Sequence, residues 1–490
     1  MAILPNKCKF RALMSAAGSS LPKWLESSHN ATHITLVLHT LTKRERTRVS
    51  ARTASRHQSH PSKTHRISHF ASTISNNSDH VNWYSVSVGS NQDNRADNRY
   101  SDIEPYDRTR VIVSHGQLEQ GDAGPCAEGR YLNANWVREL AGGKWWIATQ
   151  APLPHTAHAF LSVMLQPIFR PPSTPDVDTT LHETSRIRTV VQLTQNFEHG
   201  MRKAHVYFPP VEGQSWIVPP EEGCNVPSLK VTLLSSKSID EAHCVQSTVS
   251  IQPLSLSTES EAGGPVIFRH MLYASWPDHG VPVPEDRMGL LNFIRLVDNM
   301  NGDLSTQPAG TELDPNPPIM VNCSAGVGRT GAFIALSSLL RAHGFLSPPV
   351  SAAEGKPVPP LPPSPLGPLP EEIREDLVAQ EIEALREQRP AMVQRDDQVL
   401  LIYEVLVAAF TGDHTNIVCF SLRGPSRRAQ PVLTLTSGVT RYGLSLLTTG
   451  FCGTIRLMLG LARRRITLKR GADSLPRADE GIPSGYAHYL

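Results

Sequence analysis

Short apolar runs alternate with turns rich in Gly and Pro between residues 82 and 412, and this pattern predicts one folded domain of mixed α and β structure. The runs typical of strands are 109–113, 145–150, 188–194, 204–208, 229–234 and 266–273. Longer runs with apolar residues three or four apart predict helices at 286–300, in the segment after Arg329, and at 377–388.

One predicted boundary between a strand and a helix carries a cysteine and an arginine. The apolar run 317–321 predicts a buried strand, and 333–344 predicts a buried helix that ends at Gly344. The string VNCSAGVGRTGAF (321–333) joins them. The residues between Cys323 and Arg329 are small: Ser324, Ala325, Gly326, Val327 and Gly328.

Such a loop is suited to binding a phosphate. Its small residues allow their N–H groups to converge on one point next to a helix N-terminus, where an anion is favoured. The planar guanidinium of Arg329 can bind two phosphate oxygens at once. In this positive environment Cys323 is expected to be a thiolate, which can attack phosphorus.

The N-terminal region, residues 1–80, is basic, with twelve Lys and Arg against three acidic residues. A disordered tail and a mitochondrial targeting segment share this composition. Ile34, Val37, Leu38 and Leu41 recur at helical spacing and indicate one embedded amphipathic helix. We therefore expect a mostly disordered tail that contains up to one helix.

The C-terminal region, residues 413–490, is rich in Arg and carries no motif that predicts a function. Its apolar stretch Tyr442–Ala462 is interrupted by Arg456, which makes a membrane span the less favoured interpretation. We expect an uncharacterised basic tail.

Composition adds few constraints. The chain has 490 residues, which allows several domains or one large domain with tails, and its net charge of +2 indicates neither nucleic acid nor membrane as a partner. The seven cysteines are scattered without C-x-x-C spacing. This argues against a disulfide framework or a structural zinc site and favours a reducing compartment.

A proline-dense insertion at 347–370 predicts extended polyproline II or coil. Lys356, Pro359 and Pro362 form a K-x-x-P-x-x-P spacing of the kind that Src-homology-3 domains bind. A plain solvated loop is the favoured alternative, because such spacings arise often in any proline-rich run.

The chain resembles the cysteine-dependent protein tyrosine phosphatases, in the phosphotyrosine-specific, non-receptor branch, and its later part is similar to fungal members. The resemblance covers residues 98–410. The strings that carry it are CSAGVGRTG, DNRYSDIEPYDRTRV (97–111), YLNANWV (131–137), KWWIATQAPLPHT (144–156), QLTQNFEHGMRKAHVYFP (192–209), SWPDHGVP (275–282) and QRPAMVQRDDQVLLIY (388–403). It implies an α/β fold, in which a highly twisted mixed sheet is flanked by helices and the strand–loop–helix turn binds phosphate.

The resemblance assigns roles to residues of these strings. Cys323 would be the nucleophile, Arg329 would bind phosphate, Asp278 would be the general acid, and Gln398 would position water. Residues 324–328 would bind phosphate as well. Tyr100 would stack on the substrate ring and wall a slot too deep for phosphoserine, and Asp102 would accept from the substrate backbone N–H. Among the supporting residues, Glu198 would hold Arg329, Lys203 would face the loop that carries Asp278, and Arg389 would brace the cysteine loop. The other supporting residues would be Gln394, Asn322 and Thr330.

Four positions depart from the family pattern. Asp97 stands where Lys is usual, Ala151 where Gly is usual, and His279 where an aromatic residue is common. Asn322 replaces the His that usually precedes the cysteine. Because an amide carries no charge, we expect a less depressed pKa for Cys323 and a more alkaline ascending limb in the pH–rate profile.

These features predict hydrolysis of phosphotyrosine in proteins through a cysteinyl-phosphate, with no metal or cofactor, because the loop itself supplies positive charge. Two alternatives stay open. The first is a catalytically weak module that only binds phosphotyrosine. The second is an enzyme for phosphoserine, phosphothreonine or phosphoinositides, which Tyr100 argues against. Resemblance to fungal members implies mitogen-activated protein kinases as substrates. We also expect a cytoplasmic monomer, with a nuclear pool or mitochondrial targeting as alternatives.

Overall fold

The computed structural model describes residues 21–59, 77–113, 129–165, 186–255, 264–278, 280–307, 314, 316–348 and 360–412. The chain divides into two units, Met1–Leu422 and Arg423–Leu490, and every described residue lies in the first. The expected C-terminal tail and the stretch at 442–462 lie outside the described residues.

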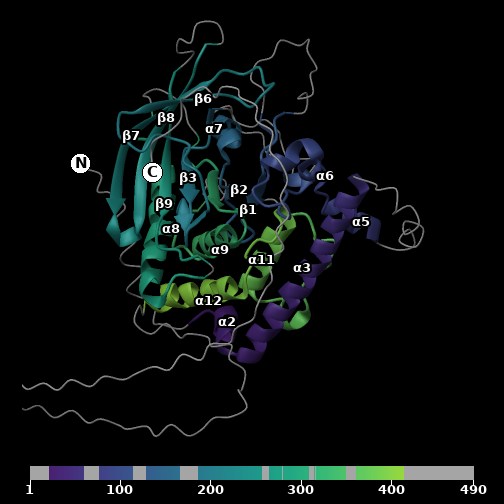
Figure 1. Cartoon of the computed structure of the whole chain (residues 1–490). Coiled ribbons are helices and arrows are strands. Elements are labelled where there is room, and N and C mark those ends of the chain that lie inside the picture. The colour runs from purple at the N-terminus through teal and green to yellow at the C-terminus, as the bar shows by residue number, and fades with distance from the viewer. Residues whose placement is uncertain are drawn as a thin grey trace, which may run out of the picture. The chain divides into compact units, whose positions relative to one another are not determined.

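An eight-stranded mixed sheet forms the centre of the domain, in the order β1-β2-β10-β3-β9-β8-β7-β6 (Figure 1). Its strands are β1 (Ala134–Arg138), β2 (Trp145–Gln150), β3 (Thr189–Gln192), β6 (Ser215–Val218), β7 (Leu229–Ile239), β8 (Cys244–Pro253), β9 (Val266–Tyr273) and β10 (Ile319–Cys323). The middle strands β2, β10, β3 and β9 run parallel, and the outer pairs are antiparallel. A separate hairpin pairs β4 (Phe197–Glu198) with β5 (Met201–Arg202).

Helices cover both faces of the sheet, and side chains alternate between two cores. Val321 and Cys323 of β10 point into one core with α9, while Met320 points into the other with α7. The helices are α2 (Lys23–Glu26), α3 (Ala31–Ser59), α5 (Asn77–Trp83), α6 (Ser87–Ser90), α7 (Ala157–Leu165), α8 (Arg287–Gly302), α9 (Gly328–Ala342), α11 (Leu377–Gln388) and α12 (Asp396–Thr411). The expected α/β class with a strand–loop–helix turn is confirmed.

Two predicted strands are absent from the described part of the chain. Residues 204–208 form no strand, and 109–113 contribute only isolated bridges from Arg110 and Val113. Some of their apolar side chains are nonetheless buried, as Val111 and Tyr207 are, whereas Ile112 and Val206 are more than half exposed. The apolar runs therefore indicated burial only in part, and the neighbouring ladder that a strand requires is missing.

The expectation of a mostly disordered N-terminal tail does not hold for residues 21–59. The helix α3 has 29 residues and lies beside α11 (Figure 1). Ile34, Val37, Leu38 and Leu41 join the core that contains α9, so hydrophobic burial anchors the first half of this helix.

The described end of the proline-rich insertion is not a plain solvated loop. Leu369 is buried in the main core, and Arg44 of α3 donates to the carbonyl oxygens of Leu366 (3.2 Å) and Gly367 (2.7 Å). Lys356 and Pro359 of the K-x-x-P-x-x-P spacing lie outside the described residues.

Among the described helices, none is long and apolar enough to cross a bilayer.

Candidate active site

Cys323 lies at the carboxyl end of β10, where four parallel strands bring their ends to one edge of the sheet. The loop then turns back so that the N–H of Gly326 points at Cys323 Sγ, with N and Sγ 3.3 Å apart. Gly326 has φ of 71°, and a Cβ there would lie 2.0 Å from the carbonyl oxygen of Thr149. Only glycine fits this position, and α9 starts directly after the turn.

A cavity of about 340 Å³ opens above this loop. Most of the predicted site residues line it; these are Tyr100, Asp102, Glu198, Lys203, Asp278, Cys323, Ser324, Ala325, Val327, Gly328, Arg329, Gln394 and Gln398. The remaining four, Gly326, Asn322, Thr330 and Arg389, do not line the cavity and are buried. One pocket therefore brings together residues that are far apart in the chain, from Tyr100 to Gln398.

Arg329 is held by two oxygens of Glu198. Nη1 and Nη2 donate to Oε1 (2.7 Å) and Oε2 (2.8 Å), and Nη1 also donates to the carbonyl oxygen of Leu193 (3.0 Å). Burial opposes ionisation of Glu198, but its bonds with Arg329 outweigh this and lower its pKa. The pair fixes the direction of the guanidinium at the pocket floor.

Asp278 lies against the same arginine. The carbonyl oxygen of Pro277 accepts from Arg329 Nη2 (3.0 Å), and Asp278 Oδ1 lies 3.6 Å from that nitrogen. The other oxygen, Oδ2, is 3.0 Å from Lys203 Nζ and 3.5 Å from His199 Nδ1. Three basic side chains therefore surround the carboxylate. His279 lies outside the described residues.

The loop favours the thiolate of Cys323. Burial alone would raise the pKa of this thiol, but the Thr330 hydroxyl, the Arg329 charge and the N–H groups of Thr330 and Val327 together lower it. The Thr330 hydroxyl is buried and has no oxygen or nitrogen partner in the described structure, so it is available to the sulfur. By contrast, burial raises the pKa of Cys244 to about 12.

Tyr100 stands at the rim of the cavity. Its hydroxyl lies 2.8 Å from Ser324 Oγ, which in turn donates to the carbonyl oxygen of Lys203 (2.7 Å). The side chain of Tyr100 is 37% exposed, so one edge of the ring faces solvent while its hydroxyl contacts the loop. Asp102, from the same segment, also lines the cavity.

Arg389 and Asn322 support the loop from behind. Arg389 donates to the carbonyl oxygens of Gly326 (2.8 Å) and Ala325 (3.0 Å), so these carbonyls point away from the cavity and the N–H groups can point into it. Burial lowers the pKa of Arg389 to about 10. Asn322 Nδ2 donates to the carbonyl oxygen of Cys323 (3.1 Å), while its Oδ1 is buried without a hydrogen-bond partner in the described structure.

Gln398 lies at the start of α12, where its Oε1 accepts from the backbone N–H of Arg395 (3.2 Å). A Cβ on Gly328 would come within 2.8 Å of the Gln398 amide, so the glycine allows this close approach. The preceding segment docks on the cysteine loop through the N–H of Val393, which donates to the carbonyl oxygen of Val327 (3.2 Å).

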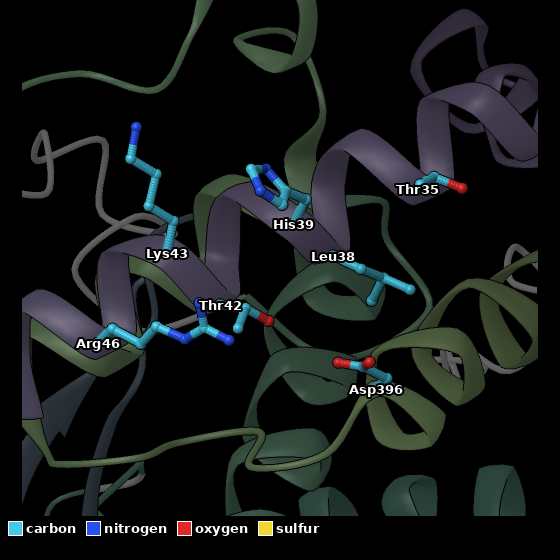
Figure 2. Close-up of a pocket in the computed structure, with 7 residues that line it drawn as sticks. All are labelled: Thr35, Leu38, His39, Thr42, Lys43, Arg46 and Asp396. Carbon is cyan, nitrogen blue, oxygen red and sulfur yellow. The ribbon is translucent and has the colours of Figure 1, made fainter.

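Sequence reasoning missed several contacts of the site. Thr194, Met201 and Arg395 also line the cavity, and His199 contacts Asp278. Met201, His199 and Thr194 lie in or beside the predicted string 192–209, but a single sequence holds no signal that selects them. Arg395 adjoins Asp396, which lines a second groove of about 670 Å³ against α3 (Figure 2).

No group of three His, Cys, Asp or Glu side chains placed to hold a metal ion occurs among the residues that the structure describes. The positive charge at the cavity comes from protein groups: Arg329, Lys203 and the N–H groups of the loop.

Cys323, Arg329 and Asp278 thus line one cavity at the carboxyl end of β10, and comparison with known proteins identifies the family. The model of the protein-tyrosine phosphatase family matches residues 94–168 and 181–343, and this part of the chain belongs to that family. All the segments that supply Cys323, Arg329, Asp278 and Tyr100 fall within the match.

Three relatives illustrate the similarity. Tyrosine-protein phosphatase 99A of Drosophila melanogaster is 24% identical over 66% of this chain and 19% of its own length. The human non-receptor type 14 enzyme is 28% identical over 51% of this chain and 17% of its own length. The mouse non-receptor type 18 protein is 27% identical over 67% of this chain and 54% of its own length. This chain therefore spans about half or less of these relatives.

Proposed function

We propose that this protein hydrolyses phosphotyrosine in proteins through a cysteinyl-phosphate intermediate. The observation that carries the proposal is that Cys323 and Asp278 line one cavity and both lie against the guanidinium of Arg329. A nucleophile and a proton donor on either side of a phosphate-binding cation are what transfer of a phosphoryl group from a phenol requires.

In the first step the Cys323 thiolate attacks phosphorus. The S–P bond forms as the bond from phosphorus to the phenolic oxygen breaks, and Asp278 gives its proton to that oxygen. Charge on the equatorial oxygens is stabilised by the N–H groups of the loop and by Arg329. The proton matters because a phenolate has a conjugate acid of pKa about 10.

In the second step water attacks phosphorus, the S–P bond breaks and the thiolate is regenerated. Asp278, now ionised, takes the proton from water, and Gln398 positions the water. Gln398 is suited to this role because its side chain is 4% exposed and lies against Gly328 at the mouth of the loop. Gln394, exposed on the same cavity, is the second candidate.

Substrate choice follows from the rim. Tyr100 and Asp102 wall the cavity on one side, so we propose phosphotyrosine in preference to phosphoserine, phosphothreonine or phosphoinositides. We also propose mitogen-activated protein kinases as the substrate class, on the ground of the resemblance to fungal members that the sequence of the later part suggests. We further propose that the enzyme acts as a cytoplasmic monomer and that an Src-homology-3 domain binds the 347–370 insertion.

The test is turnover of p-nitrophenyl phosphate, of a phosphotyrosine peptide and of the matching phosphothreonine peptide. Cys323→Ser is expected to lose at least about 10⁴-fold in kcat, because the nucleophile is gone. Cys244→Ser is the matched control, since Cys244 is equally buried but lies in β8 away from the cavity. Activity that survives in Cys323→Ser, or equal turnover of the two peptides, would contradict the proposal.

A further inference from the structure

Helix α3 carries an arginine at every fourth position from its middle onward: Arg44, Arg48, Arg52 and Arg56. Residues four apart lie on the same face of a helix, so these side chains form one row. The row faces the phosphatase domain, since Arg48 is fully buried and Arg52 is 4% exposed. Arg44 and Arg48 share the partner Glu383, while Arg52 and Arg56 contact the segment around residues 102–106.

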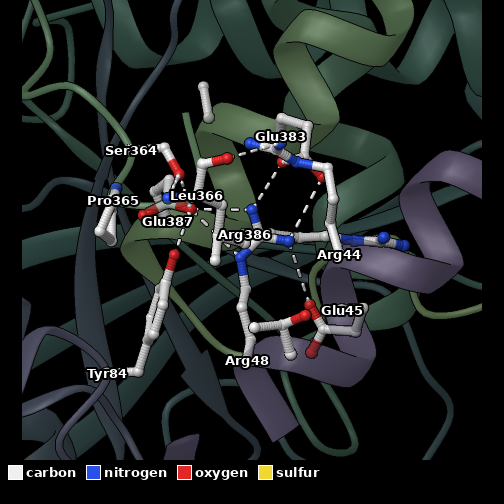
Figure 3. A network of polar contacts seen from close by, with 12 residues as sticks. Arg44, Glu45, Arg48, Tyr84, Ser364, Pro365, Leu366, Glu383, Arg386 and Glu387 are labelled. Atoms are coloured by element: carbon white, nitrogen blue, oxygen red, sulfur yellow. Dashed lines mark hydrogen bonds and ion pairs between the residues drawn. The ribbon is translucent and has the colours of Figure 1, made fainter. Parts of the chain in front are cut away.

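The first two arginines anchor the helix to α11 (Figure 3). Arg44 Nε donates to Glu383 Oε2 (2.5 Å), and Arg48 Nη2 donates to Glu383 Oε2 (2.6 Å) and Glu387 Oε1 (2.8 Å). Burial disfavours the charged forms of Arg48 and Glu383, but the pairing of the two side chains outweighs this effect. The pKa of Arg48 is therefore raised and that of Glu383 is lowered. A buried paired network of this kind holds one geometry.

The last two arginines reach the segment that supplies Tyr100 and Asp102 to the cavity. Arg52 Nη1 donates to the hydroxyl of Tyr106 (3.0 Å). Arg56 grips Glu104 with two nitrogens, Nε lying 2.8 Å from Oε1 and Nη2 contacting Oε2. The same Nη2 donates to the carbonyl oxygen of Asp102 (3.1 Å).

We propose that Arg56 is a positioning residue for recognition of the substrate peptide. The proposal rests on the function proposed above and on the role that the family resemblance predicts for Asp102, as acceptor for the backbone N–H of the substrate. Arg56 fixes the carbonyl of Asp102 and the neighbouring Glu104 side chain, which is 4% exposed. The backbone of Asp102 is thereby held, and its carboxylate is presented to the cavity without an entropic cost at binding.

The geometry makes a selective prediction. p-Nitrophenyl phosphate has no peptide backbone, so Asp102 has nothing to bind in it, whereas a phosphotyrosine peptide needs Asp102 in place. Loosening the segment therefore weakens the peptide more than the small substrate. One lost or misplaced hydrogen bond corresponds to about a three- to tenfold change in affinity.

The experiment compares full-length wild type, Arg56→Ala and Arg46→Ala. Arg46 is the matched control, because it is an exposed arginine of the same helix whose side chain lines the groove beside Asp396 (Figure 2). In Arg56→Ala the ratio of KM for the peptide to KM for p-nitrophenyl phosphate is expected to rise about three- to tenfold. Arg46→Ala is expected to keep the wild-type ratio.

A charge swap separates positioning from general loss of structure. Arg56→Glu combined with Glu104→Arg re-creates the pair and is expected to restore much of the ratio that Arg56→Glu alone loses. Amide hydrogen exchange in the segment from Tyr100 to Glu104 is expected to quicken in Arg56→Ala and not in Arg46→Ala.

The proposal is overturned if the KM ratio in Arg56→Ala stays at the wild-type value, or if the double variant recovers nothing. It is also overturned if both KM values rise equally while the melting temperature falls, because that indicates a structural role only. A wild-type protein that hydrolyses neither substrate would refute the proposed function, and this inference with it. Wild-type turnover with an unchanged ratio refutes the inference alone.

Discussion

Replacing Asn322 with His tests how the loop activates Cys323. The Asn322 amide donates to the carbonyl oxygen of Cys323 (3.1 Å), and the whole side chain is buried. It therefore orients the backbone next to the sulfur but adds no charge. The pKa of Cys323 is already lowered by Thr330 and Arg329, against the effect of burial. A protonated imidazole at position 322 would add a second positive charge one residue from the thiolate.

The magnitude can be bounded from Coulomb's law. Unit charges roughly 5–8 Å apart, at an effective dielectric constant of about 20, interact by about 2–3 kcal/mol. Since one pKa unit corresponds to about 1.4 kcal/mol, the upper bound is about two units. Burial disfavours the imidazolium and reduces the gain, so we expect the pKa of Cys323 to fall by about one unit in Asn322→His.

The thiolate is the reactive form, so a lower pKa shifts the ascending limb of kcat/KM to lower pH by the same amount. Two assays report it independently: the pH–rate profile with p-nitrophenyl phosphate, and the pH dependence of inactivation by iodoacetate. Asn322→Gln is the control, because it enlarges the side chain without adding charge. If neither profile moves in Asn322→His, or if Asn322→Gln moves them equally, the electrostatic account is wrong.

Three further substitutions probe the site and the core. Glu198→Gln leaves one accepting oxygen where Arg329 now binds two. The kcat for p-nitrophenyl phosphate is therefore expected to fall about 10- to 100-fold, and an unchanged kcat would show that Arg329 needs no carboxylate. Gly326→Ala puts a Cβ 2.0 Å from the Thr149 carbonyl oxygen, at a residue with φ of 71°. The free energy of unfolding, measured in urea, should therefore fall by about 3 kcal/mol or more, and a decrease below about 1 kcal/mol would contradict the packing argument. Burial raises the pKa of Glu381 from 4.5 to about 7, so its stabilising contribution is complete below pH about 4.5 and is lost as the pH rises through 7. The free energy of unfolding should therefore fall by about 3 kcal/mol more across this range in wild type than in Glu381→Gln. Parallel curves for the two proteins would refute the assignment.

The strand, the cysteine loop and the helix after it were predictable because their geometry is local. An apolar run, a string of small residues and a second apolar run follow each other without interruption, and the structure places β10, the loop and α9 on them in that order. The segment 204–208 shows the limit of the same reasoning. Its apolar character predicted burial correctly for Ala204 and Tyr207 but not for Val206, which is exposed. Strand pairing depends on a neighbouring strand, which no property of the segment itself encodes.

The cavity residues could be placed only in part. Tyr100, Asp278 and Gln398 came from strings that resemble the family, and the structure brings them to one pocket; their catalytic roles stay predictions. Arg395 and His199 lie in two of the same strings, 388–403 and 192–209, but the resemblance assigned them no role. Arg395 directly precedes α12, and it lines the cavity because the start of this helix lies there. The position of the helix start is a property of the tertiary fold and not of the local sequence.

Helix α3 shows why a sequence with a weak apolar pattern can still fold against the domain. Its first half has the expected apolar spacing, but its second half is predominantly polar and basic, which is typical of a solvated tail. The face that Arg48 and Arg52 share is nevertheless buried, because Glu383, Glu387 and Tyr106 supply partners from segments far away in the chain. Arg48 pairs with both Glu383 and Glu387, and Arg52 bonds both Tyr106 and Glu45, so each buried charge keeps a second partner when one is removed. The second half of this helix therefore packs against the domain through polar partners elsewhere in the chain, and the periodicity of the helix alone does not predict this.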